Sequence, residues 1–234
     1  LQAYGSSILY LFLTIMTGVA LVLSNMIRLP KELAKPKHKS KKGWHISQFI
    51  EKRSLPWALM GLFIGFTYSG VLVFIPIELN SIGAGVWGSV FFALFALMII
   101  ISRPLVGKIY ARYGSRFVIY PGIILFIMGL AILGIADTPV GIIGTAPLLG
   151  LGYGAAQPAF QALAVQSAPI ERAGVSTATY FLALDIAVGA GSIILAMIAN
   201  ALGYQYLYQI TALIMVVALG LYHFIIKGYS NFEV

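Results

Sequence analysis

Ser102-Arg-Pro-Leu-Val-Gly-Lys-Ile-Tyr-Ala-Arg-Tyr-Gly-Ser-Arg116 is a short basic stretch between two long apolar runs. Four of its fifteen residues are cationic and none is acidic. Each flanking run has roughly 20 mainly apolar residues, which is the length that a membrane-spanning helix needs. The stretch therefore predicts a tight basic turn between two spans, and its glycines Gly107 and Gly114 permit such a turn because they lack a Cβ.

The composition of the whole chain agrees with a membrane protein. Its residues are 60% hydrophobic and only 9% charged, whereas a soluble domain carries about 25% charged residues. Such a chain cannot cover its surface with polar groups, so it must use lipid as its solvent. The net charge of +8 does not indicate nucleic acid, because the basic residues lie between apolar runs and not on one soluble face.

Several chemistries are excluded by residue usage. The chain has no cysteine, so it has no disulfide framework, thiol nucleophile or thiolate metal site. His38 and His45 have no partners at metal-ligand spacing. We therefore expect no metal and no cofactor. No Ser/His/Asp set or pair of intramembrane acids appears, which argues against an intramembrane enzyme.

Seven apolar runs are long enough to span a membrane, and we predict an all-α membrane protein. The runs are Gly5–Met26, Trp57–Leu79, Gly83–Ser102, Phe117–Ala136, Val140–Ala164, Ser176–Ala199 and Tyr204–Ile226. Most links between them are short, so neighbouring spans must be antiparallel.

Charge is segregated to one side of these spans. All fifteen Lys and Arg residues lie in the links after the first, third and fifth spans, or just after the seventh. The opposite links carry only the acids Glu78 and Asp137. By the positive-inside rule, the basic side is cytoplasmic and the N-terminus lies outside. We expect a multi-pass protein of the cell membrane, in the plasma membrane of a bacterium.

The chain also contains an internal repeat at an offset of 89 residues. At this offset Gly61, Gly65, Gly85 and Gly114 meet Gly150, Gly154, Gly174 and Gly203, and Phe91-Phe92 meets Tyr180-Phe181. The offset maps spans two to four onto spans five to seven without a gap. Since each unit has three spans, the two units run in opposite directions, as in the inverted repeats of secondary transporters.

The basic stretch carries a family resemblance. Gly107-Lys-Ile-Tyr-Ala-Arg-Tyr-Gly-Ser-Arg116 resembles the loop signature of the major facilitator superfamily, Gly-x-x-x-Asp-Arg-x-Gly-Arg-Arg. The matching residues are Gly107, Arg112, Gly114 and Arg116, and the preceding Ser102-Arg103-Pro104 also resembles that family. Gly150–Gly154 with Pro158 resembles the tenth helix of its proton-coupled exporters, and 168–174 and 184–189 resemble the following loop and eleventh helix.

The resemblance implies the second half of a twelve-helix transporter. Residues 1–26 would be the last helix of an N-terminal bundle, 27–54 a basic cytoplasmic linker, and 55–234 a six-helix bundle with a 3+3 inverted repeat. The N-terminal bundle would then be a partner of this chain. Ala111 stands where the signature has Asp, and Ser115 replaces one of its Arg residues. The charge relay attributed to that acid therefore does not carry over, and the loop either takes part in gating or only anchors the topology.

Asp185 is the ionisable side chain that lies well inside a predicted span. It follows Ser176 by nine residues, which places it about 14 Å deep at 1.5 Å per residue, near the middle of a core about 30 Å thick. A charge there is costly, so the carboxyl must face protein or water, or bind a proton. This suits proton coupling or binding of a cationic substrate. The alternative is a hydrogen bond that packs helices together. Its repeat counterpart, Ala96, shows that the fold unit does not require an acid.

The fifth span is the expected wall of a substrate cavity. Tyr153, Gln157 and Gln161 recur at i, i+4 and i+8 and so form one stripe. By the resemblance, the second span also lines the cavity, where Tyr68 is the repeat counterpart of Gln157, and Tyr180 would add an aromatic wall. The alternative is that the glutamines join helices by hydrogen bonds, while the glycines of this span allow close packing.

These features favour transport of a small molecule by alternating access, with protons as the coupling ion and export of a drug, metabolite or chelator as the direction. We expect residues 1–234 to be inactive alone, and we expect no enzyme activity. A lipid or glycolipid flippase of the same fold remains an alternative. A seven-helix receptor fits the outside N-terminus, but not the repeat or the loop glycines.

Overall fold

The computed structural model describes residues 2–26 and 49–230 of the chain. The chain divides into two compact units, Leu1–Gly43 and Trp44–Val234. The first unit contains helix α1 (Gln2–Met26), whose apolar part is Tyr10–Met26. This helix corresponds to the first predicted span.

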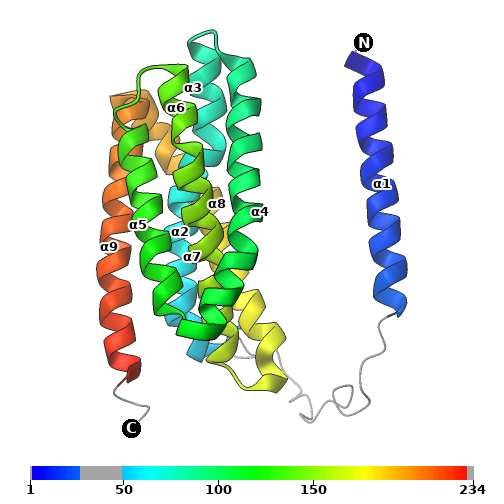
Figure 1. Cartoon of the computed structure of the whole chain (residues 1–234), viewed down its shortest axis with the longest axis vertical. Coiled ribbons are helices and arrows are strands. Elements are labelled where there is room, and N and C mark those ends of the chain that lie inside the picture. Colours follow the sequence, from blue (N-terminus) through cyan, green and yellow to red (C-terminus); the bar gives the residue numbers. More distant parts are fainter. Residues whose placement is uncertain (1, 27–48, 231–234) are drawn as a thin grey trace. The chain divides into compact units, whose positions relative to one another are not determined.

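In the described part of the second unit, all secondary-structure elements are helices (Figure 1). They are η2 (Lys52–Ser54), α2 (Leu55–Ser69), the π-helical turn η3 (Gly70–Phe74), α3 (Ile75–Ser81), α4 (Gly85–Tyr113), α5 (Arg116–Leu133), α6 (Pro139–Gly144), α7 (Ala146–Gln166), η4 (Ile170–Arg172), α8 (Ala173–Leu202) and α9 (Tyr204–Ser230). Among the described residues, six helical stretches are long and apolar enough to cross a membrane, the first of them continuous over Lys52–Ser81. With α1, they confirm the predicted all-α membrane fold.

The basic stretch is mostly helix, which corrects the prediction of a tight turn over its whole length. Helix α4 continues to Tyr113, and Gly107 lies inside it with open space around its Cα. Only Gly114 makes the turn, with φ of +86°. Cationic residues mark the end of the apolar run, but Lys and Arg favour helix, so the helix continues until a residue with left-handed backbone ends it.

The structure preserves the internal repeat. Gly114 and its counterpart Gly203 both have positive φ, +86° and +92°. Each donates its N–H to the carbonyl four residues earlier, at 3.0 Å to Tyr110 and 2.9 Å to Ala199. Because an L-residue with a Cβ is strained at such φ values, both long helices, α4 and α8, end on a glycine for the same physical reason.

Close helix crossings occur at glycines of both repeat units. A Cβ on Gly65 of α2 would lie 2.6 Å from the Leu184 carbonyl oxygen of α8. A Cβ on Gly150 of α7 would lie 2.6 Å from the Phe95 carbonyl oxygen of α4. Small residues let the two backbones approach, as they do at helix interfaces in membranes. Each crossing joins one helix from each repeat, and the crossing of α2 with α8 corresponds to that of α7 with α4.

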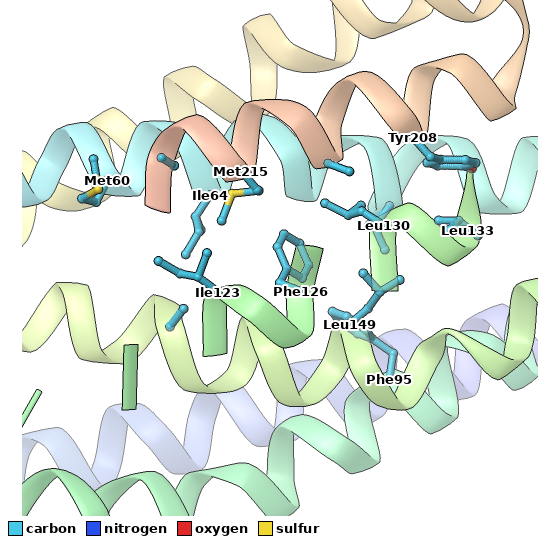
Figure 2. Packing of buried hydrophobic residues seen from close by; sticks show 14 of the residues in the cluster. Met60, Ile64, Phe95, Ile123, Phe126, Leu130, Leu133, Leu149, Tyr208 and Met215 are labelled. Atoms are coloured by element: carbon cyan, nitrogen blue, oxygen red, sulfur yellow. The ribbon is translucent and has the colours of Figure 1, made fainter. Parts of the chain in front are cut away.

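The core of the bundle lies where α5 and α9 pack on α7 and α2 (Figure 1). Figure 2 shows Ile123 and Phe126 of α5 directed toward Met60, Ile64 and Met215 from α2 and α9. These side chains are almost fully buried. Since α5 and α9 cover one side of α2 and α7, and α4 and α8 flank them, the remaining side of α2 and α7 is left for the candidate site.

The segment before α2 is fixed to the start of α8. Glu51 is buried, and its carboxylate accepts a hydrogen bond from the Arg172 guanidinium, which also forms an ion pair with it. The Glu51 N–H donates to Thr179 Oγ1 at 2.9 Å. Next to it, the buried hydroxyls of Ser54 and Ser176 are 2.7 Å apart. We call this group of five residues the basic-end clasp.

Candidate functional site

A stack of aromatic rings joins the two central helices. Tyr68 of α2 and Tyr153 of α7 stack with ring centroids 4.2 Å apart and an interplanar angle of 22°. Phe95 of α4 lies 6.1 Å from Tyr68 and 6.2 Å from Tyr153. Both tyrosines are half-buried and so keep part of their surface available. Of the predicted cavity residues, these two are the pair in direct ring contact.

The remaining residues of the predicted stripe are less accessible. Gln157 is only 7% exposed, whereas Gln161, one turn further along α7, is half-buried. Tyr180 of α8 is fully buried, and its hydroxyl donates to the Gln157 backbone carbonyl at 3.0 Å. A Cβ on Gly61 would lie 2.8 Å from the Tyr180 ring. Tyr180 therefore joins α8 to α7 and α2 and presents no surface of its own to a cavity.

Two opposite charges act on Tyr153. Asp185 of α8 and Arg103 of α4 are both exposed, and both interact electrostatically with the Tyr153 phenol. Asp185 lies near the middle of α8, one residue after Leu184, whose carbonyl meets Gly65 at the helix crossing. The Tyr153 phenol thus interacts with one carboxyl and one guanidinium and stacks on Tyr68, and these four groups come from four different helices.

The comparison with known proteins decides the family. The model of the Major Facilitator Superfamily matches residues 1–192 of the chain. The chain belongs to the Major Facilitator Superfamily. Nothing among the curated proteins matches it. Since this is a family of transporters and the structure has apolar helices that can cross a membrane, the chain is a multi-pass membrane protein with a role in transport.

The residues that match the superfamily's loop signature do not meet at one point. Arg103 lies two and a half helical turns before Arg112, which is in the last turn of α4 and lies 5.3 Å from the centroid of the Tyr113 ring. Arg116 is the first residue of α5. All three arginines are exposed. A cation in the last turn of a helix is favourable because free carbonyls gather there, which accounts for Arg112.

Glu78 is a buried acid, although the sequence predicts that it belongs to a link between spans. It lies in α3, is 9% exposed, and accepts a hydrogen bond of 2.9 Å from the hydroxyl of Tyr208 in α9. Asp185 is therefore not alone as an acid within a membrane-spanning helix. Glu78 ends an apolar run and so resembles a surface residue, and only the fold brings Tyr208, 130 residues later, to it.

No cluster that could hold a metal ion occurs within residues 2–26 and 49–230. His38 and His45 lie outside the described residues. His223 of α9 forms a hydrogen bond with Tyr120 of α5, in which the Tyr120 hydroxyl oxygen lies 2.8 Å from His223 Nδ1.

Proposed function

We propose that this protein exports a small molecule in exchange for protons, by alternating access. The substrate would lie between this six-helix bundle and a second six-helix bundle that precedes it in the chain. The observation that supports this proposal is the half-buried Tyr68–Tyr153 stack, with Asp185 and Arg103 acting on it from the flanking helices.

Asp185 has the central role in this proposal. A charged side chain exposed to lipid near the middle of a membrane costs several kcal/mol. The face of α8 that carries Asp185 must therefore meet water or another protein surface. A carboxyl in that position can bind a proton in one conformation and release it in another, and its charge can attract a cationic substrate group.

The aromatic and amide groups would bind the substrate. The Tyr68 and Tyr153 rings offer flat surfaces to an apolar or aromatic group, and Gln161 offers a donor and an acceptor without a charge. Gln157 and Tyr180 support this wall from behind, because their side chains are buried.

In this proposal, the chain contributes the second half of the transporter. Helix α1 would be the last helix of the preceding bundle, and residues 55–234 would be the C-terminal bundle. The ends that carry Lys108, Arg112, Arg116 and Arg172 would face the cytoplasm, where cations bind anionic lipid headgroups. Residues 1–234 alone would line one side of the cavity and so would not transport.

The test uses the full-length transporter in proteoliposomes that contain the pH dye pyranine. A thermal-shift screen with neutral and cationic aromatic compounds first selects a probe that binds. We expect a pH gradient to drive the probe in the direction opposite to the protons, and we expect this transport to dissipate the gradient. Asp185→Asn should abolish the coupled proton flux. Asp137→Asn, which removes an exposed acid outside the long helices, is the matched control. Coupled transport that persists in Asp185→Asn would reject the role of Asp185, and uptake by residues 1–234 alone would reject the need for a second bundle.

A further inference from the structure

The end of the bundle opposite the basic-end clasp holds a carboxyl group in an unusual setting. Glu78 is 9% exposed and Tyr208 is fully buried. Tyr208 belongs to the same buried cluster as Leu130 and Leu133, which are also fully buried (Figure 2). Leu79, next to Glu78, is fully buried as well. The carboxyl therefore sits against apolar packing, with the Tyr208 hydroxyl as its polar contact.

No cation neutralises Glu78 among the residues that the structure describes. Tyr208 is the titratable group that faces its carboxyl, and Tyr204, on the same helix, interacts with Tyr208. Helix α4, which packs on α3, carries no titratable residue before Arg103. A carboxylate buried without a counter-charge is costly, and binding a proton removes that cost.

The element that carries Glu78 is joined to the bundle by a π-helical turn. η3 connects α2 to α3, and a Cβ on Gly70 in this turn would lie 3.3 Å from Leu195 of α8 and from Leu207 of α9. A π-helical turn leaves part of the regular i to i+4 hydrogen bonding unused, and such turns are frequent at functional sites. The turn thus separates α2, which packs closely on α8, from α3, which carries Glu78.

We propose that Glu78, held by Tyr208, is a proton-binding site of this transporter, separate from Asp185. The carboxyl is protonated when it accepts the hydrogen bond from Tyr208 of α9, as in this structure. It gives its proton to water when α3 moves away and the carboxyl becomes hydrated. The inference rests on the proposed proton-coupled function, because it supplies a site for a coupling proton near the end of the bundle that the basic residues avoid.

The test measures protonation directly and does not need a substrate. Infrared difference spectra of the full-length protein in lipid nanodiscs are recorded as the pH is lowered from about 8 to about 5. Exposed acids remain ionised over most of this range, since their reference pKa values are about 4. We expect a protonated-carboxyl C=O band, and we expect Glu78→Gln to remove it. Asp137→Asn should leave the band unchanged. Tyr208→Phe should move it to higher frequency, because the carbonyl loses a hydrogen bond.

Each outcome decides the proposal. Spectra of Glu78→Gln that match the wild type would overturn it. A band that Glu78→Gln removes but Tyr208→Phe does not shift would reject Tyr208 as the partner. If Glu78→Gln does not fold, the shift in Tyr208→Phe still identifies the band. If the Glu78 band is present but the protein shows no proton-coupled transport, the proposed function is rejected and the proton-binding site is retained.

Discussion

The two ends of the helical stretch Lys52–Ser81 each involve a buried glutamate, but the two acids have different partners. At one end, Glu51 accepts from the Arg172 guanidinium and also binds through its backbone to Thr179. At the other, Glu78 accepts from the neutral Tyr208 hydroxyl. The ion pair of Glu51 with Arg172 joins the start of α2 to the start of α8, whereas the carboxyl of Glu78 has a neutral phenol as its partner, and our proposal is that it binds and releases a proton. The two glutamates are similarly buried, so their different partners distinguish the fixed joint at Glu51 from the proposed proton-binding site at Glu78.

The close packing of α2 on α8 holds the middle of this stretch in place, and Gly65→Ala is the substitution that should disturb it most. The new Cβ would meet the Leu184 carbonyl oxygen at 2.6 Å, so α2 must move away from α8. We expect a loss of about 3 kcal/mol in stability, since overpacking a core typically costs 1–3 kcal/mol. Thermal unfolding of the purified protein measures it. Gly189→Ala, on α8 with open space around it, is the control and should leave the melting temperature nearly unchanged.

Glu51→Gln tests the fixed joint itself. The substitution removes the ion pair between Glu51 and the Arg172 guanidinium, and about a third of the Arg172 side chain is exposed. We therefore expect a loss of about 2 kcal/mol, below the 3–5 kcal/mol typical of a fully buried pair. Glu171→Gln removes the exposed acid next to Arg172 and serves as the control. Equal melting temperatures for the two variants would show that the clasp does not stabilise this end.

Ser176→Ala removes a neutral part of the same clasp. The Ser176 hydroxyl lies 2.7 Å from that of Ser54 and donates to the Ala164 carbonyl at 2.6 Å. We expect a loss of about 1 kcal/mol, the usual net value of a hydrogen bond. Ser192→Ala, whose hydroxyl donates to the Gly189 carbonyl of its own helix, should cost less in the same unfolding assay. A larger loss for Ser192→Ala would argue against a tertiary role for the Ser54–Ser176 contact.

Glu78→Gln should have the smallest effect on stability and so sharpens the contrast with Glu51. Glutamine keeps an acceptor for the Tyr208 hydroxyl and carries no charge, as does a protonated glutamic acid. We expect a change below about 1 kcal/mol. Unfolding at neutral pH, side by side with Glu51→Gln, measures it. A loss as large as that of Glu51→Gln would mean that Glu78 is ionised in the folded protein.

Much of the fold was predictable because it depends on local patterns. Apolar runs locate the helices, and the offset of 89 residues correctly pairs Gly114 with Gly203. The predicted end of α4 was wrong, because cationic residues mark where a helix leaves the membrane and not where the helix ends. The site was less predictable. The stripe Tyr153–Gln161 follows helical spacing, but its ring contact with Tyr68, and the pairing of Glu78 with Tyr208, depend on how distant helices pack.

The paired turns at Gly114 and Gly203 also have a consequence for how the protein enters the bilayer. Each turn is so short that its two helices must insert together as a hairpin. The Gly114 turn is flanked by Arg112 and Arg116, and carrying an arginine through the hydrocarbon costs about 2.5–3.5 kcal/mol. The residues around Gly203 carry no charge. Two hairpins of the same shape thus differ in the work needed to translocate their tips, and only the second can cross the bilayer without moving an arginine.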